Sequence, residues 1–321
     1  MSATALNTTA EGRRSEEQGA PRGAGGTGRI GRGRRGGFAG RAGARRGRMP
    51  AWAWWTVCSL IALMFLLPLI ALLVTVVKTP QEAAASPPAY LPHGISLENF
   101  EALTDSREGL WRYVWNSLLV SLGTVLVTVI VSTLAGYGFA RFRFPLRGML
   151  FGAVLLCMMI PFQAILTPLY MVLRFLHLQN SLIGLVFVYA TFQLPISVFL
   201  MRNSFEQIPR VLPESAQIDG CSTLSSLWRV LLPLVRPGAV SVALFAFFSA
   251  WNEFLAALVL LSDEAKFTLP IFLTVLASGQ LGTIDWGVLE AGVLVTMVPC
   301  ALIFLILQRY YVRGLVAGAV K

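Results

Sequence analysis

The sequence predicts an all-α membrane protein with six transmembrane helices, a polar helix–turn–helix loop near its middle and a disordered N-terminal tail. Hydrophobic residues make up 55% of the 321 residues and charged residues only 13%, about half the charged share of a soluble domain. Six apolar runs are long enough to cross a bilayer, which takes about 20 helical residues. The segments between them alternate between many and few basic residues, as the two sides of a membrane require.

Residues 1–50 form the tail and consist mainly of Gly, Ala, Arg, Ser and Thr. Because the tail has few large apolar side chains, their burial cannot offset the conformational entropy lost on folding, and we expect the tail to be disordered. This tail holds eleven arginines and three glutamates, which is most of the net charge of +10. Its GRGRRG stretch at 31–36 matches a dinucleotide fingerprint by accident, because neither a strand nor an amphipathic helix flanks it. A solvated cytoplasmic tail is the prediction, and binding to nucleic acid or anionic lipid is its alternative.

The six predicted spans are predominantly apolar, and only two acids, Glu253 and Glu290, lie within them. They are Trp52–Val77, Trp115–Ala140, Met149–Leu173, Ser181–Met201, Gly238–Leu261 and Trp286–Gln308. The five prolines that lie inside four of them are expected to be tolerated, since neighbouring helices can satisfy the freed carbonyls. The chain then divides into the tail, a first span with its outer loop, a core of five spans and a C-terminal end, at 1–50, 51–110, 111–309 and 310–321.

The distribution of Lys and Arg orients these spans in the membrane. The segments rich in basic residues are the tail, 141–148, 202–237 and the C-terminal end. The poorer segments are 78–114, 174–180 and 262–285. Because basic loops stay on the cytoplasmic side, both termini are predicted to be cytoplasmic, in the plasma membrane of a prokaryote.

The loop at 209–237 is too polar to enter lipid and is punctuated by proline and glycine. A first helix is predicted from Pro209 or Pro213 to Ile218, with Glu214 near its positive end. Gly220 stands where a helix C′ residue adopts a left-handed conformation. A second helix from Thr223 to about Leu231 has apolar residues at helical spacing, and Pro233 is expected to end it. The fifth span is then expected to begin at Pro237–Gly238.

Particular residues of this loop resemble the EAA loop of ABC importer permeases. Glu214-Ser-Ala216, Asp219-Gly220 and Leu232-Pro233 follow that family's order EAA, DG and LP, and Ser215 and Cys221 are small replacements. The stretches PFQAILTPLY at 161–170, WNEFLAALVL at 251–260 and the ending RYYVRGLVAGAVK are similar to carbohydrate permeases of the maltose-transporter type. The resemblance covers about residues 50–321 and fits the six-span subunit of that pair.

The resemblance implies the ABC type I importer permease fold and a set of partners. Two permease chains form the pore, the EAA loop of each enters a groove on an ATP-binding subunit (expected as a homodimer), and a soluble solute-binding protein delivers sugar outside. The chain has no GxxxxGK[ST] motif for ATP phosphates, so ATP and Mg are expected to be used by the partner. By this resemblance Glu214, Ala216, Asp219, Gly220 and Pro233 form the ATPase-coupling loop, with Glu214 and Asp219 in polar contacts and Gly220 in a tight turn.

Candidate substrate contacts are polar residues inside the spans, which are costly there and mark function. Trp251, Asn252 and Glu253 offer the aromatic face, amide and carboxylate that read sugars, and Gln163 is a weaker candidate. Since consecutive residues cannot share one helix face, the alternative is that Asn252 or Glu253 bridges to another span or to the partner permease.

The sequence indicates a transport subunit and not an enzyme. No catalytic triad or paired-carboxylate arrangement stands out, and four scattered cysteines with two histidines predict no metal site. The leading function is a permease for a sugar or oligosaccharide. The alternatives are the same architecture moving a polyol or glycerol phosphate, a carrier without an ATPase, and a membrane-tethered protein that binds nucleic acid or lipid through its tail.

Overall fold

The computed structural model describes residues 50–83, 85, 92–106, 108–279 and 284–319. The chain divides into two units, Met1–Trp55 and Thr56–Lys321. Of the first unit the description includes only residues 50–55, where helix α1 begins. Of the predicted disordered tail, residues 1–50, all but Pro50 lie outside the described residues.

The described residues contain five helices that are long and apolar enough to cross a membrane. These are α1 (Ala51–Val76), α4 (Leu110–Arg141), α7 (Leu182–Glu206), α10 (Leu232–Asn252, part of a continuous run from Thr223) and α13 (Trp286–Ala319). Each overlaps a predicted span, and the prolines at 68, 195 and 299 stay inside their helices. The all-α membrane fold is confirmed.

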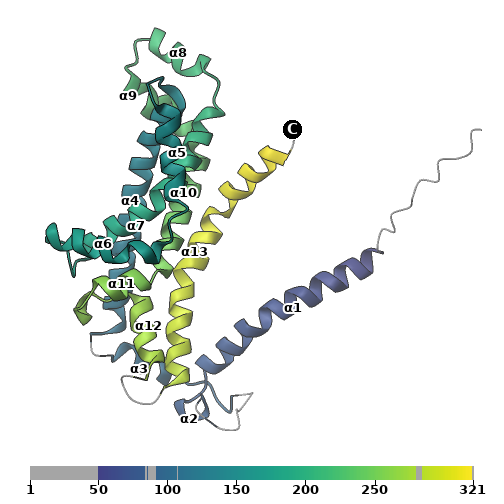
Figure 1. The fold of residues 1–321 in the computed structure, drawn as a ribbon. Helices are drawn as coiled ribbons and strands as arrows, with labels where there is room; N and C mark the ends of the chain where they lie inside the picture. Colours follow the sequence, from purple (N-terminus) through teal and green to yellow (C-terminus); the bar gives the residue numbers. More distant parts are fainter. Residues whose placement is uncertain (1–49, 84, 86–91, 107, 280–283, 320–321) are drawn as a thin grey trace, which may run out of the picture. The chain divides into compact units, whose positions relative to one another are not determined.

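The predicted span Met149–Leu173 is not one straight helix. It consists of α5 (Arg147–Cys157) and α6 (Phe162–Phe175), which are bent by 102° at a short break. Pro161 stands at this break in an extended conformation, φ −65° and ψ 130°. A proline disfavours helical backbone at the preceding residue and removes one N–H, so the helix stops before it. Figure 1 shows α6 running across the direction of the neighbouring spans, and the six-span count holds only if this bent pair is one span.

The other described helices are short and lie between the spans. They are α2 (Pro80–Ala83), α3 (Glu98–Thr104), α8 (Val211–Ile218), α9 (Thr223–Ser226), α11 (Leu255–Leu260) and α12 (Leu269–Ala277), with a π-helical turn at Leu227–Leu231 and a 3-10 turn at Glu264–Lys266. Figure 1 shows α8 and α9 at one end of α4, α7 and α10, with α3 and α12 at the opposite end.

Helix α4, which packs against α7 and α10, carries a stripe of buried small polar residues. The buried members of this stripe are Ser117, Ser121, Thr124, Thr128 and Ser132. Spacings of three and four residues place them on one helix face, and their small side chains let helix backbones approach closely. At Gly136 of α4 there is no room for a side chain, since an added Cβ would lie 2.7 Å from Met201 Cβ of α7.

Candidate functional site

Helix α8 ends in a turn that requires glycine. The backbone N–H of Cys221 donates to Ala216 O at 2.9 Å, and that of Gly220 donates to Gln217 O at 3.0 Å. These two bonds form a Schellman motif, in which the C′ residue is left-handed. Gly220 has φ +86° and nothing within 4 Å of an added Cβ. Its requirement is therefore conformational, as the sequence predicts, and is not set by space.

The second helix of the loop begins as predicted but does not stop as predicted. The Ser222 hydroxyl accepts a hydrogen bond from the N–H of Ser225 at 3.3 Å and caps α9. From there the chain is helical through the π-helical turn and α10 to Asn252, so the expected end at Pro233 and the new start at Pro237–Gly238 are wrong. Pro233 is the second residue of α10, directly after the π-helical turn, where its missing N–H falls in an already shifted bonding pattern.

The predicted coupling residues are divided between two sides of the loop. Glu214, Asp219, Gly220 and Pro233 are exposed, whereas Ala216 is buried. Large apolar side chains lie exposed beside them, at Val211, Leu212, Ile218, Leu224 and Trp228. Val211 and Ile218 are two turns apart on one face of α8 with Glu214 between them. We call the exposed residues Val211, Glu214, Ile218, Leu224 and Trp228 the α8 surface.

Trp251 is a core residue and not an exposed aromatic face. It is 1% exposed, its indole N–H donates to Thr296 O of α13 at 3.0 Å, and its ring stacks on Phe247 with centroids 5.6 Å apart. A buried indole with its one donor satisfied and its ring stacked has no free face for a ligand. Trp251 thus joins α10 to α13.

Glu253 stands in the break between α10 and α11 and is bonded within the chain. Its carboxylate accepts hydrogen bonds from the N–H groups of Ala256 at 2.9 Å and Ala257 at 3.3 Å, which cap the start of α11. The hydroxyl of Tyr189 in α7 donates to it at 2.5 Å. Glu253 therefore makes the bridge to another span that was the alternative to sugar contact.

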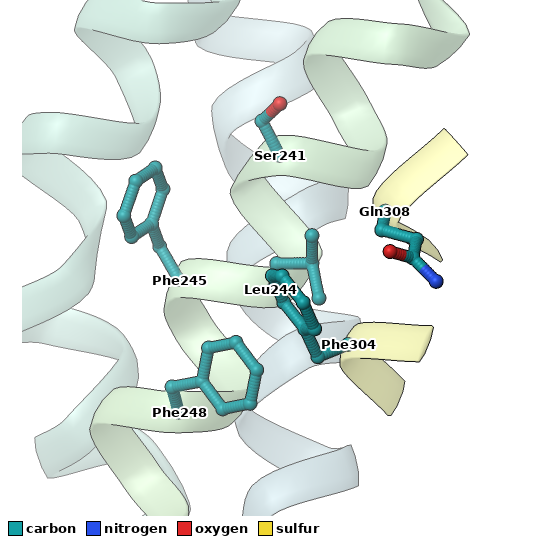
Figure 2. Close-up of a pocket in the computed structure, with 6 residues that line it drawn as sticks. All are labelled: Ser241, Leu244, Phe245, Phe248, Phe304 and Gln308. Carbon is teal, nitrogen blue, oxygen red and sulfur yellow. The ribbon is translucent and has the colours of Figure 1, made fainter. Parts of the chain in front are cut away.

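Asn252 is exposed next to a groove that the sequence reasoning missed. Its side-chain N–H donates to Phe248 O of the preceding turn at 2.8 Å. Figure 2 shows the groove, which is lined by Ser241, Leu244, Phe245 and Phe248 of α10 and by Phe304 and Gln308 of α13. Its volume is about 210 Å³. The spacing of Ser241, Phe245, Phe248 and Asn252 at one helix face was the signal in the sequence.

Gln163 does not join this group. It is exposed in the first turn of α6, next to the bend, and is not among the residues that line the groove. Of the four predicted substrate contacts, the structure thus places only Asn252 on an exposed face next to the groove.

Comparison with known proteins gives the same architecture. Residues 128–316 match the family described as binding-protein-dependent transport system inner membrane component. The chain is 34% identical over 248 residues to the sulfoquinovosyl glycerol transport system permease protein SmoH of Agrobacterium fabrum, covering 77% of this chain and 86% of that protein. It is 33% identical over 247 residues to the diacetylchitobiose uptake system permease protein DasC of Streptomyces coelicolor, covering 77% and 88%.

A solved structure shows the same fold. It is that of a bacterial ABC transporter involved in the import of the acidic polysaccharide alginate, with TM-score 0.71, 21% identity and coverage of 81% of this chain and 95% of that chain. With the family match and these two relatives, the chain belongs to the binding-protein-dependent transport system inner membrane components, the permease subunits of ABC importers.

Proposed function

We propose that this chain is the permease subunit through which an ABC importer moves a sugar or oligosaccharide across a prokaryotic plasma membrane. A separate ATP-binding subunit, present as a homodimer, docks on the α8 surface. A second permease completes the pore, a solute-binding protein delivers the substrate outside, and both termini are cytoplasmic. ATP and Mg are used by the ATP-binding subunit.

The observation that carries the docking proposal is the exposure of the α8 surface. Ile218 is 86% exposed and Val211 is 66% exposed, in a loop whose polar residues keep it out of lipid. Exposed apolar groups of this size mark sites of protein association. Burial of each such side chain contributes about 1.5–3 kcal/mol, while Glu214 and Asp219 supply polar contacts around them.

The continuous helix from Thr223 to Asn252 supports a mechanical link between docking and transport. At 1.5 Å per residue, Leu224 of the α8 surface lies about 36 Å along the helix from Phe248 of the groove. A movement imposed on the loop by the ATP-binding subunit therefore reaches the groove without crossing a helix break in this run.

The groove supports a sugar as the transported solute. Aromatic faces at Phe245 and Phe248 can stack on the apolar faces of sugar rings, and Ser241 and Gln308 add a hydroxyl and an amide to the lining. Asn252 supplies a further amide one helical turn beyond Phe248. Both relatives described above carry names that include a glycoside or a sugar derivative. A polyol or glycerol phosphate is the alternative solute.

A matched pair of substitutions tests the docking site. Ile218→Asp places a charge on the α8 surface, and Ile95→Asp places one at an equally exposed position, 85%, on the loop before α3. We expect Ile218→Asp to lose the ATP-binding subunit during mild-detergent purification from the native host, with subunits quantified by mass spectrometry. Ile95→Asp is expected to retain it. Equal retention in both variants would remove the docking proposal.

A further inference from the structure

We propose that Arg141, at the end of α4, is a positioning residue that fixes the start of the coupling loop to this span. We call this restraint, the hydrogen bonds of Arg141 to the last turn of α7 and to the connection that leads into α8, the Arg141 pin. Through it, a movement of α8 is passed to α4 as well as along α10. The inference rests on the proposed function only for the meaning of that movement, since the contact itself is a property of this chain.

The guanidinium of Arg141 reaches the backbone where α7 leads into α8. Its Nη2 donates to Phe205 O at 2.7 Å and to Ile208 O at 2.8 Å. Phe205 is in the last turn of α7 and Ile208 is in the short connection to α8. The final carbonyls of a helix lack intrahelical donors and carry partial negative charge. A guanidinium in this place satisfies them and holds the exit direction of the chain.

Arg141 also faces the coupling helix itself. It lines a cavity of about 200 Å³ together with Arg210, Glu214 and Gln217 from α8 and its N-terminal flank. Glu214 is thus shared between this cavity and the α8 surface. A partner that binds the Glu214 carboxylate at the α8 surface therefore also changes the charge that faces Arg141 across the cavity.

Near Arg141, helices α4, α7 and α10 are packed too closely to slide past one another independently. The Tyr137 ring meets the Phe205 ring with centroids 5.5 Å apart, and an added Cβ at Gly136 would lie 2.8 Å from Arg202 N. A Cβ at Gly238 would overlap Ser204. Helices α4, α7 and α10 therefore pack against one another as one unit, and Arg141 bonds this unit to the connection that leads into α8.

Arginine is specifically suited to this position. The Nη2 that donates to the two carbonyls is part of a rigid, planar guanidinium. A lysine ammonium is instead a strongly hydrated point charge on a flexible stem, so it is held less firmly. Arg141→Lys should therefore restore only part of the restraint, and Arg141→Gln should remove it.

The test measures the position of the loop directly. In the full chain, Cys58, Cys157 and Cys300 are replaced by alanine, and spin labels are attached to the native Cys221 of the loop and to Arg143→Cys, which is exposed two residues after Arg141. Pulsed electron paramagnetic resonance then gives the distance distribution between the two labels in nanodiscs. The matched control is Arg174→Gln, an exposed arginine at the end of α6.

We expect one narrow distance in the parent protein and in Arg174→Gln. In Arg141→Gln the population of a detached loop should rise about ten-fold for each charge-assisted hydrogen bond that is lost, and Arg141→Lys should fall between. A distribution in Arg141→Gln as narrow as that of the parent would overturn the proposal. If Arg141→Gln does not fold, Arg141→Lys decides in the same way, because an unbroadened distribution there also overturns it.

The same samples separate this inference from the proposed function. If no ATP-binding subunit co-purifies with the parent protein, the proposed function fails, while the label distances still test the pin in the permease alone. If the ATP-binding subunit is retained and the distances do not respond to Arg141, only the pin fails.

Discussion

Tyr189 donates a hydrogen bond to the carboxylate of Glu253 at 2.5 Å and so joins α7 to the break between α10 and α11. Residue 253 is where the fifth span stops being helical, and its side chain replaces the missing backbone partners of the next helix. The Glu253 carboxylate thus has a structural role within an apolar span, because it accepts hydrogen bonds from the Tyr189 hydroxyl and from the N–H groups of Ala256 and Ala257.

We expect Glu253→Ala to destabilise the chain, because it leaves the N–H groups of Ala256 and Ala257 and the Tyr189 hydroxyl without an acceptor. Unsatisfied buried groups cost about 1–3 kcal/mol each, while Tyr189→Phe removes one bond at about 1 kcal/mol. Thermal unfolding of the purified chain in detergent measures both. Thr191→Val, on the same helix, is the control. Lost uptake with unchanged stability in Glu253→Ala would instead indicate a substrate contact.

Gly220→Val is expected to uncouple ATP hydrolysis from transport. A β-branched residue is strained at φ +86°, and the left-handed conformation costs roughly 1–2 kcal/mol for ordinary residues. Gly220→Asn should be milder, since asparagine tolerates this conformation. Uptake and ATP hydrolysis are measured together in proteoliposomes, with Gly148→Val as the control, because an added Cβ at Gly148 meets open space. Normal uptake in Gly220→Val would contradict the turn's role.

Asn252→Ala and Phe248→Ala test the groove as part of the sugar pathway. Each is expected to weaken apparent affinity, by about two- to ten-fold for a stacked ring worth about 0.5–1.5 kcal/mol. Uptake is measured with a panel of labelled mono- and oligosaccharides, a polyol and glycerol phosphate. Phe175→Ala, at an exposed position at the end of α6, is the control. Asn252→Ala with normal uptake and affinity would remove Asn252 from the pathway.

Acid should weaken the turn that precedes α12. The pKa of Asp263 is lowered by the hydrogen bond from the N–H of Ala265 at 3.1 Å, and then by Lys266 at 3.3 Å. Because the folded pKa is below the unfolded value of about 3.9, this stabilisation is present above that value and is lost as the pH falls through the folded pKa. Midpoints of thermal unfolding should therefore fall less steeply with acid in Asp263→Asn than in the parent. The same slope in both would contradict this.

Much of the architecture is readable from the residues in order. Hydropathy is a sum over neighbouring residues, so the runs that form α1, α4, α7 and α13 are visible without any contact between them. Gly220 is equally local, because its backbone conformation depends on the turn and on the absence of a Cβ. Properties that depend only on residues close together in the sequence, such as hydropathy and turn conformation, can therefore be predicted from the sequence.

Other features depend on partners that are distant in the chain. Trp251, Asn252 and Glu253 are consecutive and look alike as candidates, yet the first bonds to α13, the second is exposed beside a groove and the third bonds to α7. The same is true of the prolines. Pro161 stands at a helix break, whereas Pro233 lies within the continuous helical run from Thr223 to Asn252.

By itself the sequence determined the membrane class, the positions of α1, α4, α7 and α13 and a polar loop with a left-handed turn, because each follows from composition or local backbone preference. Only the tertiary structure decided that α5 and α6 form a bent pair, that one helix runs from Thr223 to Asn252, and that Arg141 reaches Phe205 and Ile208. The physical reason is that side-chain direction and hydrogen-bond partners are set by packing between helices, which no window along the chain contains.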